Sequence, residues 1–316
     1  MRKHLLATSL VLLSSTVGAG GSGHQLTSTK QAIALDTRVG TLSANLYLPA
    51  GVDKPPVVIV TGAWTTVKEQ MPATYAEALV EKGYAAVTFD FRGWGESKDM
   101  IQFLEDPTRK TEDIRAVIDA ISKLDSIDGQ RIAGLGICAS SGYMLDATAG
   151  NSLIKAVAVV APWLHDKAMA TTIYGGEESV TSLLAAAETA ENSSEPIYLE
   201  AASVTNSDAL MYQAPYYTET DRGLIPEYDN QFNVASWSGW LNYDAQLSAS
   251  KQDKPVLMVA SESMALPAGA HSYLDRAGEN LNAVWLEGIS QFDFYDQPKA
   301  VSETVDALIA HFDLNL

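Results

Sequence analysis

Short apolar runs separated by amphipathic segments make up much of the sequence. Four of these runs are five to seven residues long and contain no charged residue: 55–61, 84–89, 132–137 and 157–161. Such runs are typical of strands that are buried on both faces of a sheet. The spacing of apolar positions predicts helices over 75–82 and 113–124, between successive strands. Strands that alternate with helices favour a mainly parallel sheet with right-handed crossovers.

The pattern differs near the N-terminus and resumes near the C-terminus. Residues 31–36 and 41–47 alternate apolar and polar side chains, which predicts an antiparallel edge pair. Near the C-terminus the strand-and-helix rhythm returns, with strands predicted at 255–260 and 282–286 and a helix between them at 268–276. A last helix is indicated by one apolar stripe, formed by Val301, Val305, Leu308 and Phe312.

This rhythm is absent between residues 162 and 250. That segment is about a quarter of the chain, yet it holds 11 of the 26 aromatic residues. We interpret it as a cap that is inserted between two strands of the sheet and folds over the turn that follows residues 132–137. The core is then formed by residues 31–161 and 251–316.

The most informative stretch is the end of the predicted strand at 132–137. The strand stops at Cys138, and small residues continue into a helix. A nucleophile on a tight strand-to-helix turn requires small neighbours two positions to either side, and Gly136 and Ser140 meet that requirement. The turn aims the following amides at developing negative charge. Cys138 is therefore the predicted nucleophile. Ser140, with a small residue at Gly142, is the alternative, and a purely structural cysteine is a third interpretation.

The N-terminus has the pattern of a secretory signal peptide. Basic residues precede a short apolar run, and the small residues at 17–19 predict cleavage after Ala19. Residues 20–30 form a small, polar leader that we expect to be flexible. The apolar run is too short to span a membrane. We therefore expect an exported protein, secreted or periplasmic.

Charge and cysteine content narrow the possible functions. The formal net charge is −18, and so acidic a surface repels phosphate backbones and anionic membranes. We expect neither nucleic acid nor a membrane as a partner. Cys138 is the only cysteine, so it cannot form a disulfide within the chain. An unpaired thiol in an exported protein is open to oxidation unless it is shielded or functional. No metal-binding or phosphate-binding motif is visible, so no cofactor or metal is predicted.

Five motifs in order resemble those of a known superfamily. They are Thr61-Gly-Ala-Trp64, the loop Asp90 to Ser97, the Gly-Ile-Cys-Ala-Ser turn, Leu266-Pro267 and Phe292-Asp-Phe-Tyr-Asp296. The chain resembles the α/β-hydrolase superfamily, and within it the dienelactone-hydrolase-like and peptidase-S15-like bacterial hydrolases. The resemblance implies an α/β-hydrolase fold, in which helices flank a mainly parallel central sheet and a cap is inserted. It also implies hydrolysis of an ester, lactone or thioester.

The resemblance also assigns roles by position. Cys138 would be the nucleophile, and the amides of Trp64 and Ala139 would form the oxyanion hole. Glu262 is the one carboxylate in the loop where the family carries its acid. The family's histidine base should stand just before residue 292, where this chain has Gln291. A glutamine cannot accept a proton, so the usual relay is incomplete.

The five histidines offer one substitute for the missing base. His165 follows a strand beside the predicted turn, at the catalytic end of the sheet, and Asp166 could orient it. A solvated or core histidine is the alternative for this residue. The other four lie in the signal, the leader or helices further from the turn: His4, His24, His271 and His311.

Two classes of function fit these observations. A cysteine thiolate needs less help from a base than a serine hydroxyl, so a hydrolase could work with Gln291. If water hydrolyses the acyl-enzyme slowly, the protein could instead be an acyltransferase, which passes the acyl group to a better nucleophile than water. A ligand-binding protein that has lost turnover is the other class. In each case we expect a small-molecule ligand, and the aromatic cap favours an apolar or aromatic group.

Overall fold

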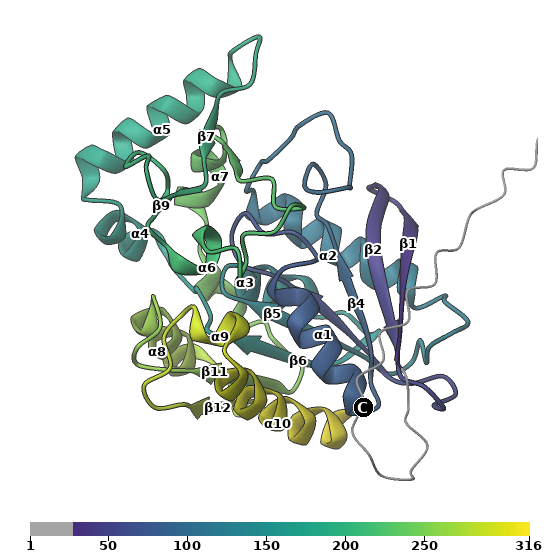
Figure 1. Ribbon diagram of the computed structural model, residues 1–316. Coiled ribbons are helices and arrows are strands. Elements are labelled where there is room, and N and C mark those ends of the chain that lie inside the picture. The colour runs from purple at the N-terminus through teal and green to yellow at the C-terminus, as the bar shows by residue number, and fades with distance from the viewer. Residues whose placement is uncertain (1–27) are drawn as a thin grey trace, which may run out of the picture.

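Figure 1 shows the computed structural model of the chain, which describes residues 28–316. The predicted signal peptide and most of the leader lie outside these residues. Eight strands form one sheet in the order β1-β2-β4-β3-β5-β6-β11-β12. Within this sheet, only the pairs β1–β2 and β2–β4 are antiparallel. The predicted mainly parallel sheet of an α/β-hydrolase fold is confirmed.

The strands lie within three residues of the runs that predict them, and the largest difference is at the start of β6. The antiparallel edge is formed by β1 (Thr29–Thr37) and β2 (Gly40–Leu48). The parallel strands that follow are buried along nearly their whole length: β3 (Val57–Thr61), β4 (Ala85–Phe89), β5 (Ile132–Ile137), β6 (Ile154–Val160) and β11 (Val256–Ala260). The last strand, β12 (Leu281–Trp285), is only partly buried because it closes the far edge.

Helices cover both faces of this sheet (Figure 1). The helix α1 (Met71–Glu81) contacts α10 (Pro298–Asn315), and α2 (Pro107–Ile121) contacts α3 (Ser140–Thr148). Two short helices, α8 (Pro267–Arg276) and α9 (Asp293–Asp296), follow β11 and β12. The helix α2 begins six residues before the predicted start at 113, because Asp106 caps it by accepting a hydrogen bond from the Arg109 amide and Pro107 opens its first turn.

The segment between β6 and β11 contains short elements that lie together to one side of the sheet, at the upper left of Figure 1. We call residues 162–250 the cap. Its helices are α4 (Lys167–Ile173), α5 (Glu177–Glu191), α6 (Pro215–Thr218) and α7 (Ser236–Asn242), followed by a 3₁₀ turn over Ala245–Ser248. Its strands pair as β7 (Tyr198–Glu200) with β10 (Gln231–Asn233) and β8 (Ala202–Ser203) with β9 (Met211–Tyr212).

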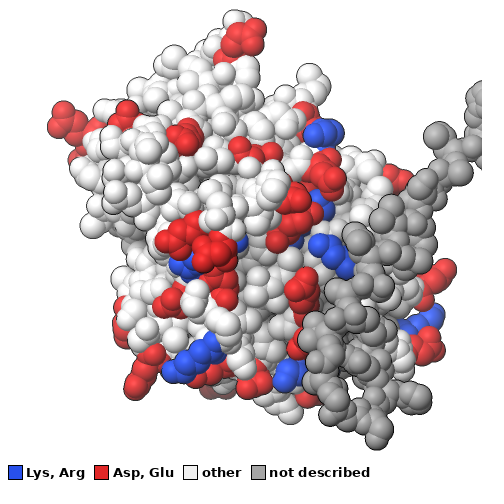
Figure 2. Space-filling view, in the orientation of Figure 1, with Lys and Arg blue, Asp and Glu red and all other residues white. Residues whose placement is uncertain are grey.

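The surface is strongly acidic, as the net charge of −18 requires. On the face shown in Figure 2, Asp and Glu side chains are distributed over the surface and are more abundant than Lys and Arg. Within residues 28–316, no helix is both long enough and apolar enough to cross a membrane.

A buried lysine organises the loop at residues 90–97, one of the five sequence motifs. Lys68 has a side chain that is 1% exposed, and its Nζ lies 2.8 Å from carboxylate oxygens of Glu69, Asp90 and Glu96. The Asp90 carboxylate also accepts hydrogen bonds from the amides of Lys68 and Glu96. These bonds hold the loop against the segment that follows β3.

We expect Lys68→Met to lower the free energy of unfolding by about 3 kcal/mol, because it leaves the buried Asp90 carboxylate without its cation. Denaturant titration at pH 7 would measure the change. Lys299→Met is the matched control, because the side chain of Lys299 is 79% exposed and its ion pair should contribute less than about 1 kcal/mol. Equal stability of the two variants would contradict this account.

Candidate active site

The turn between β5 and α3 holds Cys138 in an unusual backbone conformation. Its φ is 57°, in the left-handed region that residues other than glycine rarely adopt. Three hydrogen bonds fix the turn: the Cys138 amide donates to the carbonyl of Val160, and the Cys138 carbonyl accepts from the amides of Ser141 and Trp163, all at 3.0 Å. This is the geometry of a nucleophile elbow, which presents one side chain at the carboxyl edge of the sheet.

The small residues around the turn are required by close contacts. A Cβ atom on Gly136 would lie 2.5 Å from the Ser140 carbonyl oxygen, and one on Gly142 would lie 2.7 Å from the Tyr243 hydroxyl. Ser140 is buried, and its hydroxyl donates to the Gly62 carbonyl. The structure therefore places Cys138 at the tip of the turn and Ser140 beneath it, in the first turn of α3.

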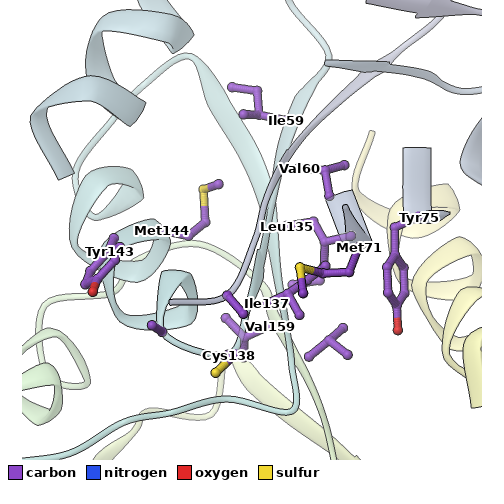
Figure 3. Close-up of a cluster of buried hydrophobic side chains, with 14 of the residues drawn as sticks. Ile59, Val60, Met71, Tyr75, Leu135, Ile137, Cys138, Tyr143, Met144 and Val159 are labelled. Carbon is purple, nitrogen blue, oxygen red and sulfur yellow. The ribbon is translucent and has the colours of Figure 1, made fainter. Parts of the chain in front are cut away.

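Three hydrogen-bond donors surround the sulfur of Cys138. Burial raises the pKa of the Cys138 thiol, and hydrogen bonds from the Tyr295 side chain and from the amides of Ala139 and Trp64 act in the opposite direction. Figure 3 shows Cys138 beside the buried cluster that includes Ile137 and Val159. The two amides that converge here are those expected to form the oxyanion hole.

A cavity of about 880 Å³ opens at Cys138. Its walls come from the turn, the loop after β3, the cap and the loops that follow β11 and β12. Most lining side chains are apolar or aromatic, among them Trp64, Trp163, Tyr174, Leu183, Met211, Tyr217, Trp237, Trp240 and Phe292. Within residues 28–316, the side chains that line this cavity include no Asp, Glu, His, Lys or Arg.

Gln291 lines the same cavity, and its amide group is fully hydrogen-bonded. Its Oε1 accepts from the Ala265 amide at 3.0 Å, while its Nε2 donates to the Ala161 carbonyl at 3.0 Å and to the Tyr295 hydroxyl at 2.9 Å. Since Tyr295 accepts from Gln291, its own proton is free to be donated to the sulfur of Cys138. Gln291 is thus connected to Cys138 through Tyr295.

Tyr295 is a site residue that the sequence reasoning missed. Burial raises the pKa of its hydroxyl well above the ordinary value, so the group stays protonated and serves as a donor. The available signal was its position in the Phe292-to-Asp296 motif, four residues after Gln291 and so on the same side of a helical turn.

Glu262 lies outside the cavity, although its neighbour Ser263 lines it. The side chain of Glu262 is 70% exposed, and Oε1 lies 2.8 Å from Nε2 of His271. His271 in turn stacks on Trp285, with the ring centroids 4.3 Å apart. The predicted acid therefore pairs with a surface histidine instead of facing Cys138.

His165 also lies outside the cavity lining. Its Nδ1 accepts from the Trp163 indole at 3.1 Å, and its Nε2 lies 2.9 Å from the Trp240 carbonyl, to which the neutral Nε2–H tautomer donates. Burial lowers the pKa of this imidazole. Both nitrogens are thus engaged, and His165 joins two cavity tryptophans. The structure brings Cys138, Ala139, Trp64 and Gln291 together, and it places Glu262 and His165 elsewhere.

Comparison with known proteins identifies the family. The profile of the X-Pro dipeptidyl-peptidase (S15) family matches residues 40–265. The chain belongs to this S15 family. Its fold and family are those of hydrolases of the α/β-hydrolase type, as the sequence motifs predicted.

Similar proteins match this chain over most of its length. The uncharacterized protein YcjY of Escherichia coli K12 is 30% identical over 293 residues, which cover 87% of this chain and 95% of that protein. The crystal structure of hypothetical protein PA2218 from Pseudomonas aeruginosa superposes with a TM-score of 0.81 at 24% identity, covering 96% of this chain and 99% of that one. A dienelactone hydrolase from Anabaena variabilis superposes with a TM-score of 0.57 at 13% identity, over 92% and 99% of the two chains.

No group of three or more His, Cys, Asp or Glu side chains that could hold a metal ion occurs within residues 28–316.

The buried histidine predicts how stability depends on pH. Because the pKa of His165 in the folded chain lies below the ordinary value of 6.5, the unfolded state takes up more protons as the pH falls. The stabilisation is complete above about pH 6.5 and is lost on acidification. We expect His165→Asn to be less stable than wild type at pH 7 and to lose less further stability at pH 5.

Denaturant titrations of both proteins at pH 7 and pH 5 would measure this difference. An identical loss on acidification would contradict it. If His165→Asn loses turnover at pH 7 while remaining folded, the role of base predicted from the sequence would be supported instead.

Proposed function

We propose that this protein hydrolyses an ester, lactone or thioester through the thiol of Cys138. The observation that carries the proposal is the position of that thiol, at the tip of a turn with φ 57° and beside the amides of Ala139 and Trp64. A nucleophile and two amide donors at one point are what acyl transfer requires. We further propose that the enzyme acts after export, on the basis of the signal-like residues 1–19.

The lining of the cavity favours an uncharged substrate with an apolar or aromatic group. A charged group in this cavity would lose its hydration without gaining an oppositely charged partner, because no charged side chain lines the walls among the residues described. Aromatic walls such as Trp237, Trp240 and Phe292 offer large contact areas to planar or aliphatic groups. A volume of about 880 Å³ accommodates a drug-sized molecule.

The first chemical step can be derived from the donors around the sulfur. The sulfur of Cys138 attacks the substrate carbonyl carbon, and the carbonyl oxygen becomes an oxyanion that accepts from the Ala139 and Trp64 amides. The bond to the leaving group then breaks, and the leaving oxygen or sulfur takes up the proton released by the thiol. Tyr295 is placed to pass that proton, since it contacts the sulfur and is itself held by Gln291.

The second step, hydrolysis of the acyl-cysteine, lacks a base among the side chains of residues 28–316 that line the cavity. Water must attack the acyl-cysteine carbonyl, the C–S bond must break, and the proton must return to the sulfur. No carboxylate or imidazole lines the cavity among the residues described, so nothing there accepts the proton of the water. We therefore expect slow deacylation.

The expected slow deacylation favours acyl transfer as a second candidate function. An amine or thiol acceptor is a better nucleophile than water, so it could remove the acyl group from Cys138 without a strong base. Adding such acceptors to a reaction mixture distinguishes the two. Faster turnover with acceptor supports transfer, and ligand-induced stabilisation without any acylation would point to a binding protein.

Replacing the nucleophile tests the proposal most directly. We expect Cys138→Ala to abolish turnover of an activated ester, and iodoacetamide to add one label to the wild-type chain with parallel loss of activity. Mass spectrometry of the intact protein would count the label. Ser140→Ala is the matched control, because Ser140 is buried and bonded to Gly62. Full activity in Cys138→Ala, or abolition only in Ser140→Ala, would transfer the role to Ser140.

Restoring a base tests the role of Gln291. We expect Gln291→His to speed hydrolysis of the acyl-enzyme by about 10²-fold, which is the scale of general-base assistance. The lifetime of the acylated protein would be followed by mass spectrometry. Gln291→Asn shortens the amide without adding a base and should not speed this step. An unchanged or longer lifetime in Gln291→His would show that the chain uses another base.

A further inference from the structure

The loop that carries the Trp64 amide is held from two sides. Thr65, the next residue, is fully buried and has a φ of 62°, in the left-handed region. Its amide donates to Oε2 of Glu105 at 2.9 Å, and its hydroxyl lies 3.2 Å from the hydroxyl of Tyr228 in the cap. A threonine keeps such a conformation only where its surroundings enforce it.

The direction of the Trp64 amide follows from these anchors. The carbonyl of Ala63 accepts from the hydroxyl of Thr66 at 2.6 Å and from its amide at 3.4 Å. In a trans peptide the next N–H points opposite to the carbonyl, so this contact turns the Trp64 amide away from Thr66. The Glu105 carboxylate fixes the following peptide through Thr65. Both peptide planes around Trp64 are therefore determined.

Glu105 is itself a fully buried junction between the core and the cap. Its carboxylate oxygens each lie 2.8 Å from Nζ of Lys110, and one accepts from the Tyr143 hydroxyl at 3.0 Å. Its backbone amide donates to the Ser236 hydroxyl, which belongs to α7 of the cap. Tyr143 lies in α3, directly after the nucleophile turn. Glu105 thus joins the oxyanion loop and the helix α3 through its carboxylate, and the cap through its backbone amide.

The cap reaches the same loop through its aromatic side chains. The ring of Trp64 lies 5.0 Å from that of Phe232 and 5.2 Å from that of Trp240, between centroids. A buried ion pair is seldom retained for stability alone, because desolvation offsets most of its attraction. A carboxylate that binds the amide beside an oxyanion donor has a more specific use, which is to hold that donor in place.

We propose that Glu105 and Tyr228 are positioning residues of the oxyanion hole, through which the docked cap sets the direction of the Trp64 amide. This inference rests on the proposed function, because it gives the Trp64 amide a role in acyl transfer from substrate to Cys138. Neither residue lines the cavity, so neither contacts substrate. Their effect reaches the reaction through Thr65.

Two reactions of the same thiol separate this role from a merely structural one. Acylation of Cys138 by an activated ester, p-nitrophenyl acetate, builds an oxyanion and needs the hole. Alkylation by iodoacetamide displaces iodide at a saturated carbon and builds none. Loss of oxyanion alignment should therefore slow acylation much more than alkylation, which loses only the contact of the Trp64 amide with the sulfur.

The variants to compare are Tyr228→Phe and the double variant Glu105→Gln with Lys110→Met, which avoids burying an unpaired ammonium. We expect acylation to slow by about 10-fold to 10²-fold in the double variant and by less in Tyr228→Phe, with alkylation rates within about twofold of wild type. Tyr84→Phe and Asp113→Asn are matched controls, because they remove a tyrosine hydroxyl bond and a buried carboxylate away from the loop. Tyr228→Phe loses only one hydroxyl contact and keeps the test open if the double variant does not fold.

The outcomes distinguish failure of the positioning role from failure of the proposed function. Acylation at the wild-type rate in Tyr228→Phe and in a folded double variant would overturn the positioning role alone. A parallel fall in acylation and alkylation would also overturn it, because the sulfur and not the hole would be affected. Wild-type protein that is alkylated at Cys138 but never acylated would overturn the proposed function, and this role with it.

Discussion

The left-handed backbone of Cys138 is the constraint on which the rest of the site depends. At a φ of 57° the chain reverses within one residue, so β5 and α3 approach closely enough that Gly136 has no room for a side chain. The conformation is unfavourable for cysteine by about 1–3 kcal/mol, and it persists because Val160 and Ser141 bond the turn from both sides. Central strands and a buried helix supply that support. The sheet therefore fixes the position of the Cys138 thiol, and the loops around it supply the hydrogen-bond donors.

Much of the fold could be predicted from the sequence because burial on both faces leaves a strong mark. Continuous apolar runs located β3, β4, β5 and β11 to within one or two residues. The cap contains no strand with such a continuous apolar run. Its strands are two or three residues long, so no period can be recognised, and its helix α5 buries only Ala187 and Ala190. The start of α2 was missed for a local reason, since its N-cap residue, Asp106, lies before the amphipathic stretch.

The site was predictable where it depends on chain position and not where it depends on side-chain direction. Cys138, Ala139, Trp64 and Gln291 were located by their place at the carboxyl ends of strands, and they share one cavity. Glu262 stands in the expected loop, yet its side chain turns to His271, a choice of rotamer that spacing does not encode. Glu105 was not found because its partner Thr65 lies 40 residues away in the sequence. Buried polar contacts of that range are visible only once the chain is folded.

The cap leaves the sheet after β6 and returns at β11, and these two strands are adjacent and parallel, with Val157 beside Val256. The inserted segment thus leaves at the carboxyl end of β6 and returns at the amino end of β11, one strand across and three residues back along the sheet, so the sheet fixes the positions of both ends whatever lies between them. Because closing a loop costs little more entropy as it lengthens, segments of very different size can occupy this position without disturbing strand order. The cap walls of the cavity can therefore change while the turn at Cys138 stays in place. Exchange of this single segment is a direct route by which such a scaffold acquires new ligands.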